Sequence, residues 1–201
     1  MRIQFLSLVL GMSLAGYAVA DGDAQAGQTK AAACGACHGA DGNSFVAAFP
    51  KLAGQNTNYL VKQMKDIMSG ARSVPTMAGQ LDGKSDQDLA DIAAYFASQK
   101  VSAGEAKKEL VALGERLYRA GDKDIGVAAC TACHSPTGSG NSAAGYPALR
   151  GQYADYTAAQ LKAFRDGQRT NDGDAKIMST VTYRLNNAEI EALASYIQGL
   201  H

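Results

Sequence analysis

The chain has 201 residues and equal numbers of basic and acidic side chains, 19 of each, so its formal net charge is zero. Residues 21–101 carry seven Lys and Arg against eight Asp and Glu, and residues 102–201 carry eleven of each. No basic stripe and no interleaving of aromatic and basic residues indicates a nucleic-acid partner. Beyond the first twenty residues, no stretch is apolar enough to span a membrane.

Residues 1–20 have the pattern of a secretory signal peptide. Arg2 supplies a positive charge, Ile3 to Ala15 form an apolar run, and Ala18-Val19-Ala20 is a cleavage site of small residues. The run is short for a spanning helix, and an uncleaved anchor is the alternative. We expect a mature protein that begins at Asp21 and lies outside the cytoplasm.

All four cysteines and two of the three histidines lie in two Cys-x-x-Cys-His motifs. These motifs are Cys34-Gly35-Ala36-Cys37-His38 and Cys130-Thr131-Ala132-Cys133-His134. The spacing is the attachment signature of c-type haem, in which the thiols bond to the porphyrin and the histidine binds the iron. Zinc ribbons separate their cysteine pairs by about 15–20 residues, and two disulfides would leave the histidines unexplained. The motifs predict two covalently bound haem c groups.

The apolar periodicity of the first half is helical. Its two stripes consist of Leu60, Met64, Ile67 and Met68, and of Leu89, Ile92, Ala93 and Phe96. Gly70 is expected to end the first helix. Ser85, with Asp88 three residues later, forms nearly a capping box and is expected to begin the second.

Residues 102–110 are expected to link two domains, 21–101 and 111–201, because the segment Lys100 to Lys108 lacks an apolar face and contains Gly104. Leu110, Leu113 and Leu117 then predict a helix that ends at Gly121. A last helix is expected to begin at Asn186, with Glu189 as its capping partner. Neither half shows alternating β-branched residues, so we predict an all-α fold without a sheet.

The second half repeats the first. The segment Phe49-Pro50-Lys51-Leu52-Ala53-Gly54-Gln55 returns as Tyr146-Pro147-Ala148-Leu149-Arg150-Gly151-Gln152, and the last-helix stripe returns as Ile190, Leu193, Ala194 and Ile197. This internal duplication predicts two tandem domains, each packed around its own haem. About nine extra residues around Asp122–Val127 precede the second haem motif, and we expect them to form a surface loop.

The sixth iron ligand is expected to be methionine, because only His201 remains as a further histidine. Met178 is the one methionine of the second half. Met77 lies 18 residues before Tyr95, just as Met178 lies 18 residues before Tyr196. Met77 is therefore expected to bind the first iron, with His38, whereas Met178 and His134 bind the second.

Met64 and Met68 share the helical stripe that begins at Leu60, so both are interpreted as core residues. The carbonyls of Pro50 and Pro147 are expected to accept the free imidazole N–H of each ligand histidine, which strengthens the histidine as a ligand. His201, at the end of the chain, is expected to be solvated.

Three pairs of polar residues also occupy matching positions in the two halves. They are Arg72 and Arg169, Gln55 and Gln152, and Tyr59 and Tyr156. We expect them either to contact the haem propionates, for which arginine forms the strongest bonds, or to be solvated surface residues retained by the duplication.

These residues together resemble the cytochrome c4 family of diheme class I c-type cytochromes. The resemblance covers nearly all of the mature chain, including the segment Arg169-Thr170-Asn171-Asp172-Gly173-Asp174 and the ending Tyr196-Ile197-Gln198-Gly199-Leu200-His201. It implies two class I cytochrome c-like haem domains related by a pseudo-twofold axis. It also implies a periplasmic carrier, sometimes held at the inner membrane, between the quinol-oxidising complex and a terminal oxidase.

An alternative function is that of a diheme oxidoreductase such as a peroxidase. Such an enzyme needs an iron that substrate can reach, or an unusual ligand such as a free thiolate. No cysteine is spare and the two halves are alike, so we predict an electron carrier without catalytic residues. The near-neutral halves depart from the charge asymmetry of some family members, so docking to partners is expected to be mainly apolar.

Overall fold

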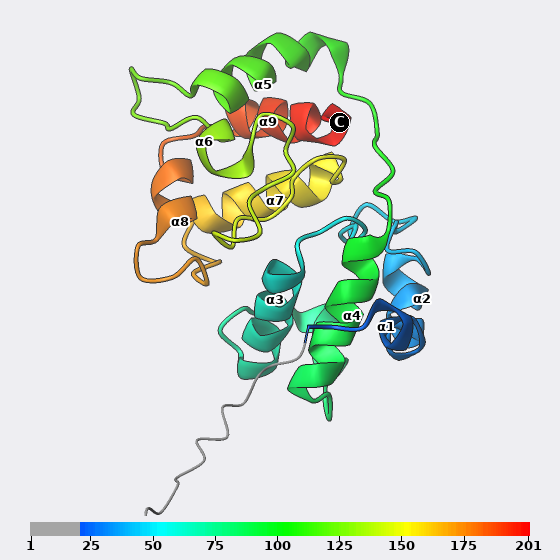
Figure 1. The fold of residues 1–201 in the computed structure, drawn as a ribbon. Coiled ribbons are helices and arrows are strands. Elements are labelled where there is room, and N and C mark those ends of the chain that lie inside the picture. The colour runs from blue at the N-terminus through cyan, green and yellow to red at the C-terminus, as the bar shows by residue number, and fades with distance from the viewer. Residues whose placement is uncertain (1–20) are drawn as a thin grey trace, which may run out of the picture.

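The computed structural model describes residues 21–201, so the predicted signal peptide, 1–20, lies outside it. The described residues form helices in two groups that follow each other along the chain (Figure 1). The first group comprises α1 (Ala24–Lys30), η1 (Ala32–Cys34), α2 (Gly35–His38), α3 (Thr57–Ser69), η2 (Pro75–Met77) and α4 (Asp86–Ser98). The second comprises α5 (Lys108–Ala120), α6 (Thr131–His134), α7 (Ala154–Arg165), α8 (Ile177–Thr182) and α9 (Asn187–Gly199).

Several of these helices begin and end where the sequence predicts. The left-handed conformation of Gly70, with φ of 78°, ends α3, and Gly121, with φ of 68°, ends α5. Complete capping boxes begin α4 at Ser85 and α9 at Asn186, so both predicted starts are confirmed. Within residues 21–201 the only β-type pairings are two isolated bridges, which confirms an all-α fold.

The first and last helices of each group cross at a glycine. A Cβ atom at Gly27 of α1 would lie 1.9 Å from the carbonyl oxygen of Asp91 in α4. One at Gly114 of α5 would lie 2.3 Å from the carbonyl oxygen of Ala192 in α9. The helices approach this closely only because neither glycine has a side chain. Gly27 and Gly114 therefore mark equivalent points of the two domains.

Each domain has its own apolar core. The core of the first is small and contains Ala31, Leu60, Ile92, Ala93 and Phe96. The core of the second is larger and contains Leu117, Tyr118, Val127, Leu185, Ile190, Leu193, Tyr196, Ile197 and Leu200. Met64 packs against the first core as predicted, but the core assignment of Met68 is wrong. Met68 is 45% exposed because it lies at the edge of the stripe in the last turn of α3.

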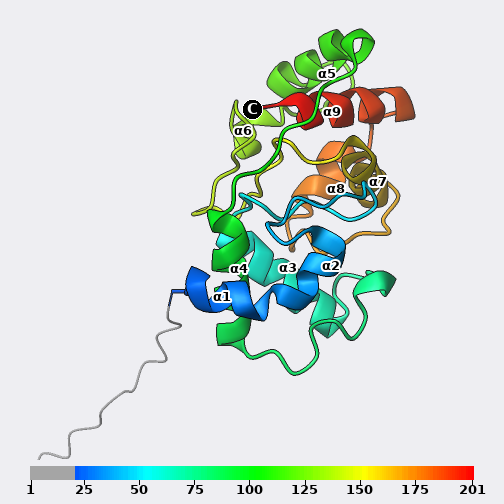
Figure 2. The same ribbon diagram turned by 90° about the vertical axis from the view of Figure 1, so that its right-hand side faces the viewer.

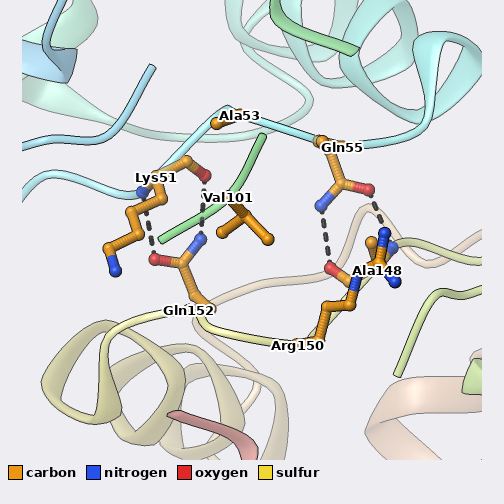
Figure 3. A pocket seen from close by; sticks show the side chains of 8 residues that line it. Lys51, Ala53, Gln55, Val101, Ala148, Arg150 and Gln152 are labelled. Carbon is orange, nitrogen blue, oxygen red and sulfur yellow. Dashed lines mark hydrogen bonds between the residues drawn. The ribbon is translucent and has the colours of Figure 1, made fainter. Parts of the chain in front are cut away.

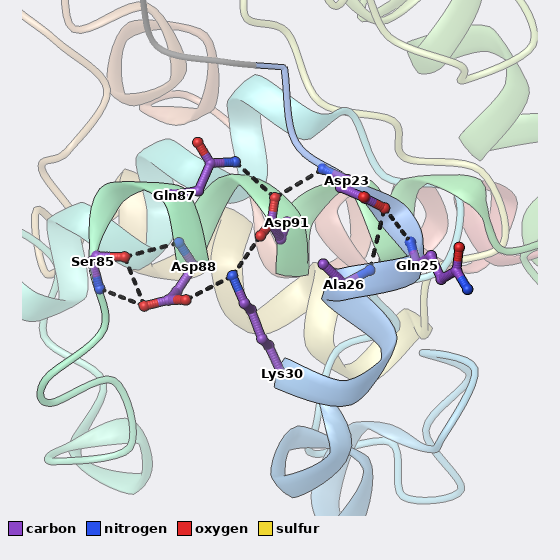
Figure 4. Close-up of polar contacts among 8 residues, drawn as sticks. All are labelled: Asp23, Gln25, Ala26, Lys30, Ser85, Gln87, Asp88 and Asp91. Carbon is purple, nitrogen blue, oxygen red and sulfur yellow. Dashed lines mark hydrogen bonds and ion pairs between the residues drawn. The ribbon is translucent and has the colours of Figure 1, made fainter.

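An ionic cluster joins α1 to α4 in the first domain (Figure 4). Lys30 Nζ lies 2.8 Å from Asp88 Oδ1 and 2.5 Å from Asp91 Oδ2. The buried Asp91 carboxylate also accepts hydrogen bonds of 2.8 Å from the Asp23 amide and from the Gln87 side chain. Lys30, the Asp23 amide and Gln87 thus satisfy a charge on Asp91 that would otherwise be costly to bury.

Two expected connections differ from the structure. Helix α5 begins at Lys108, so it includes the last three residues of the expected 102–110 linker. The Asp122–Val127 insertion is closed by a β-bridge, but it is more than a surface loop. Val127 is 5% exposed within the second core and Ile125 packs against it, because the loop folds back onto the helices.

The two domains face each other across a polar interface. In Figures 1 and 2, α3 and the loop before it lie next to α7 and the corresponding loop of the second domain. Hydrogen bonds cross between these segments at several points, as described below. Within residues 21–201, no helix combines the length and the apolar character that crossing a membrane requires.

Candidate functional site

Both Cys-x-x-Cys-His motifs fold into short helical segments. Cys34 ends η1 and leads into α2, which contains Cys37 and His38. Cys130 caps α6, which contains Cys133 and His134. Helical spacing puts the first cysteine of each motif one turn before the second cysteine and the histidine, so all three share one face.

The two histidines are buried and held in the same way. His38 and His134 are 7% and 5% exposed. The Nδ1 atom of His38 lies 2.9 Å from the Pro50 carbonyl oxygen, and that of His134 lies 2.9 Å from the Pro147 carbonyl oxygen. Because a carbonyl only accepts, Nδ1 carries the proton and Nε2 has a free lone pair. The predicted contacts with Pro50 and Pro147 are confirmed.

The electrostatic surroundings favour neutral imidazoles. Burial lowers the pKa of His38 and of His134, while the proline carbonyls act in the opposite direction and only partly offset it. A metal ligand histidine must be neutral, so this arrangement suits binding of an iron at Nε2. Phe49 packs edge-on against His38, with 6.2 Å between the ring centroids, and Tyr146 packs edge-on against His134, with 6.1 Å. These contacts limit rotation of the imidazoles.

The cysteines do not resemble a redox-active dithiol. None of the four is paired in a disulfide in the described chain. Burial raises the pKa of the Cys34 thiol, and it raises the pKa of the Cys130 thiol to about 11. Dithiol oxidoreductases instead lower the pKa of the attacking cysteine. The residues fit a role as attachment points for haem, with the histidine alongside.

The methionines expected to complete the iron coordination lie in different local structures. Met77 is the last residue of the short 3-10 turn η2, after Pro75. Met178 is the second residue of the helix α8. Both are partly buried. His201 is exposed, as expected for the end of the chain.

Matching arginine and tyrosine residues meet in the domain interface. Arg72 donates to the Tyr156 hydroxyl at 2.9 Å, and Arg169 donates to the Tyr59 hydroxyl at 3.1 Å. Each arginine also donates to the glutamine of its own domain, Arg72 to Gln63 at 2.8 Å and Arg169 to Gln160 at 2.7 Å. Each donates as well to the glutamine across the interface, Arg72 to Gln160 and Arg169 to Gln63, both at 3.0 Å. These residues are buried or half-buried, so the interpretation as solvated surface is wrong.

The interface carries an excess of positive charge. Burial alone would raise the pKa of the Tyr59 hydroxyl, but Arg169 and Arg72 outweigh it and hold that pKa below its usual value. The nearest carboxylate, Asp66, accepts a 2.6 Å hydrogen bond from Asn171, which in turn accepts from Arg169 at 2.9 Å. Each tyrosine hydroxyl accepts from an arginine and retains its own proton to donate.

The matching glutamines form a second set of exchanged contacts (Figure 3). Gln55 binds the backbone of Ala148 with two hydrogen bonds of 2.8 Å, one donated and one accepted. Gln152 binds the backbone of Lys51 in the same way, at 3.0 and 2.9 Å. Val101 stands between the two pairs, in a small pocket that they line. Each domain thus gives the other the same contact that it receives.

Gln63, Gln160 and Asn171 are interface residues that the sequence analysis did not single out. Gln63 and Gln160 match in the repeat, as the arginines and tyrosines do. A set of polar residues kept at equivalent positions of both domains is a signal for a symmetric interface, because such an interface uses each residue twice. Asn171 has no such counterpart and gave no signal.

Comparison with known proteins agrees with this geometry. The sequence model of the family "Cytochrome c" matches residues 24–100 and 111–201. The chain is 60% identical over 196 residues to a cytochrome c4 of Pseudomonas aeruginosa, and 98% of each chain is covered. A crystal structure of reduced cytochrome c4 from Pseudomonas stutzeri superimposes with a TM-score of 0.88 at 58% identity, over 90% of this chain and all of the other.

A more distant relative carries a different description. A "thiosulfate dehydrogenase electron acceptor" of Thiomonas intermedia is 38% identical over 172 residues, which cover 84% of this chain and 78% of that one. The two Cys-x-x-Cys-His motifs, the family match and the relatives indicate two covalently attached haem c groups, one in each domain. The chain belongs to the cytochrome c4 family of diheme, electron-transferring c-type cytochromes.

Proposed function

We propose that this protein is a periplasmic electron carrier that takes electrons from the quinol-oxidising complex and delivers them to a terminal oxidase. The observation that carries the proposal is that the two histidines have the same environment: each is buried and donates from Nδ1 to a proline carbonyl at 2.9 Å. Catalysis at one haem would require that haem to be different and accessible. Two equivalent sites suit the passage of electrons.

His38 with Met77, and His134 with Met178, are the proposed axial ligands of the two irons. Each bound haem would supply a redox-active iron, and ligation by histidine together with methionine would raise its potential. The protein would hold each group through a fixed, buried histidine and a partly buried methionine thioether. The matching positions of the methionines in the repeat support this assignment.

The arginines, tyrosines and glutamines of the interface are proposed as the surroundings of the haem propionates. The nearby Asp66 carboxylate pairs with Lys62 and reaches Arg169 only through Asn171, so the two guanidinium groups can accept further negative charge. Tyr59 and Tyr156 each have a hydroxyl proton to donate. Such groups would hold the two haems in fixed positions on either side of the interface, which keeps the distance for electron transfer constant.

Residues 1–20 are proposed to direct export and to be removed, leaving a protein of two domains, 21–101 and 111–201, joined by a short linker. Attachment at the inner membrane would then be peripheral. The mass of the protein purified from the periplasm tests this directly. We expect a chain beginning at Asp21 with two added haems; a retained leader or a single haem would contradict it.

A redox titration with purified partners tests the carrier function. We expect rapid reduction of both haems by the quinol-oxidising complex and rapid reoxidation by the oxidase, with negligible turnover of peroxide. Cyanide and carbon monoxide should bind slowly, because both irons are six-coordinate. Fast binding of either ligand by the resting protein would instead support the diheme peroxidase.

The thiosulfate dehydrogenase acceptor among the relatives supports a second donor for this carrier. Mixing the oxidised protein with a thiosulfate dehydrogenase and thiosulfate tests it. Reduction of haem at a rate comparable to that with the quinol-oxidising complex would make sulfur oxidation a second source of electrons. A rate lower by a factor of a hundred or more would restrict this role to the relative.

A further inference from the structure

The insertion at residues 122–127, here called the brace loop, is present in the second domain only. Gly27 lies seven residues before Cys34, whereas its equivalent Gly114 lies sixteen residues before Cys130. Helix α5 takes up some of the additional length and the brace loop takes up the rest. The first domain passes from α1 to its haem motif through η1 alone.

The brace loop is a fixed element. Its ends are joined by two backbone hydrogen bonds of 2.8 Å between Asp122 and Val127. Arg116 of α5 forms a 3.1 Å ion pair with Asp122. Val127 is buried in the core, and Ile125 packs against the core from the middle of the loop. A loop tied at its base and at its centre can support a neighbouring element.

That neighbour is α8, the helix that contains Met178. The Arg184 guanidinium, just beyond the end of α8, donates a 3.0 Å hydrogen bond to the Ile125 carbonyl. At the other end, the Asp172 carboxylate accepts 2.9 Å hydrogen bonds from the backbone and hydroxyl of Ser179. Thr182, inside α8, is completely buried. Met178 therefore lies in a helix that is held on both sides.

Within residues 21–201, Met77 has no comparable support. Its turn, η2, is held by local backbone bonds, from the Met77 amide to the Val74 carbonyl and from the Gln80 amide to the Met77 carbonyl. By the alignment of the two methionines, the position equivalent to Arg184 is Gly83, which has no side chain. The two proposed ligands thus have the same place in the repeat but unequal mechanical support.

We propose that Arg184 and the brace loop position Met178, so that the second iron exchanges its methionine for an external ligand less readily than the first. Arg184 is a positioning residue, because its proposed effect passes through α8 by way of its hydrogen bond to the Ile125 carbonyl. The inference rests on the proposed assignment of Met178 as an axial ligand.

Competition by imidazole tests the proposal in the complete diheme protein. The near-infrared charge-transfer absorption from methionine to ferric iron reports methionine ligation, and Met77→Ala and Met178→Ala variants assign the absorption to each haem. In the unmodified protein we expect imidazole to displace methionine at the first haem at lower concentration than at the second. Arg184→Met should lower the concentration needed at the second haem by about two- to tenfold, as the loss of one hydrogen bond implies.

Lys123→Met is the matched control. Lys123 lies in the brace loop itself and carries the same charge as Arg184, but among the described residues it pairs with the adjacent, exposed Asp124 alone. Lys123→Met should leave the imidazole concentration needed at each haem within twofold of that for the unmodified protein. Hydrogen exchange of the α8 amides gives an independent readout, since Arg184→Met should speed exchange there and leave η2 unchanged.

The outcomes separate the brace from the ligand assignment. If Arg184→Met and Lys123→Met changed the required imidazole concentration equally, or if Arg184→Met changed it equally at both haems, the proposed role of Arg184 and the brace loop would be wrong. A near-infrared band of the second haem that survives Met178→Ala would instead show that Met178 is not the ligand. That result would refute the proposed coordination, whatever the brace loop does.

Discussion

The first and last helices of each domain cross in the same way, but the side chains beside the crossing form an ion pair in the first domain and an apolar contact in the second. With Gly27 aligned to Gly114, Lys30 corresponds to Leu117, and Asp91 corresponds to Ala192. In the first domain this position holds the ion pair of Lys30 and Asp91. In the second, Leu117 and Ala192 are both completely buried at the equivalent point.

The comparison shows that the helix crossing depends on the glycine and the fold, and not on one kind of side-chain contact. An ionic contact requires that every polar neighbour be in place, as the Asp23 amide and Gln87 are for Asp91. An apolar contact requires only complementary volume. We therefore expect the first domain to respond to pH and the second to respond to loss of volume.

The largest expected effect concerns the proposed ligands. Met77→Ala should remove half of the near-infrared band and lower the potential of the first haem, because methionine opposite histidine favours the ferrous iron. Met178→Ala should remove the other half. Met64→Ala serves as the control, since Met64 packs in the core; it should retain the band and cost about 2 kcal/mol of stability. Loss of the band in Met64→Ala alone would reverse the assignment.

Leu117→Ala should produce the largest change in stability. Leu117 is completely buried, so its truncation leaves a cavity and should cost about 2–5 kcal/mol of the free energy of unfolding. The loss should be confined to the second domain. Urea unfolding followed separately at each haem measures it, and an equal loss in both domains would mean that they unfold as one unit.

A smaller effect is expected from acid. The contact with Lys30, and to a lesser extent the bonds from Ser85, hold the pKa of Asp88 far below its usual value. The contact with Lys30, and to a lesser extent the bonds from the Asp23 amide and Gln87, lower the pKa of Asp91 to about 2. Both values lie below the unfolded pKa of about 3.9. The carboxylates therefore stabilise the first domain above about pH 4, and this contribution is lost as pH falls towards 2.

Calorimetry between pH 5 and pH 2 measures this loss as a falling transition temperature of the first domain. Lys30→Leu combined with Asp91→Ala would introduce the residues found at the equivalent positions of the second domain. It should make the transition temperature of the first domain less dependent on pH. Asp86→Asn is the control, because Asp86 forms only an exposed pair with Lys65. A dependence that persists in the double variant would place its origin outside the cluster.

The smallest effect is expected from salt. Neither domain has a large net charge, so long-range steering of a partner is weak. Stopped-flow reduction with a partner oxidase should change only mildly between low and high ionic strength. A steep fall of the rate with salt would indicate a local charged patch and would contradict docking through an apolar surface around each haem edge.

The local structure was largely predictable, because it depends on neighbouring residues. The capping boxes at Ser85 and Asn186 and the terminal glycines Gly70 and Gly121 act within one helical turn. The histidine contacts with Pro50 and Pro147 were also predictable, since each lies in a short repeated segment. Met68 was misplaced because periodicity does not tell where a helix leaves the core.

Contacts between distant segments were not predictable. Lys30 and Asp91 are separated by 61 residues, and nothing in either local pattern links them. Arg72 and Tyr156 belong to different domains, and their repeated positions fitted a haem contact and a solvated surface equally well. Ile125 and Arg184 meet only because the insertion folds back onto the core. Such contacts depend on the packing of the whole chain.

The exchanged glutamine contacts have a consequence for the origin of the molecule. Gln55 binds the backbone at Ala148 just as Gln152 binds it at Lys51, which is the isologous pattern of a homodimer. Two separate copies of one domain would close the same interface. Joining them in one chain makes the association intramolecular and fixes the ratio at one to one. Each half is then free to change alone, so that only one copy acquired an ionic helix contact and only the other an insertion.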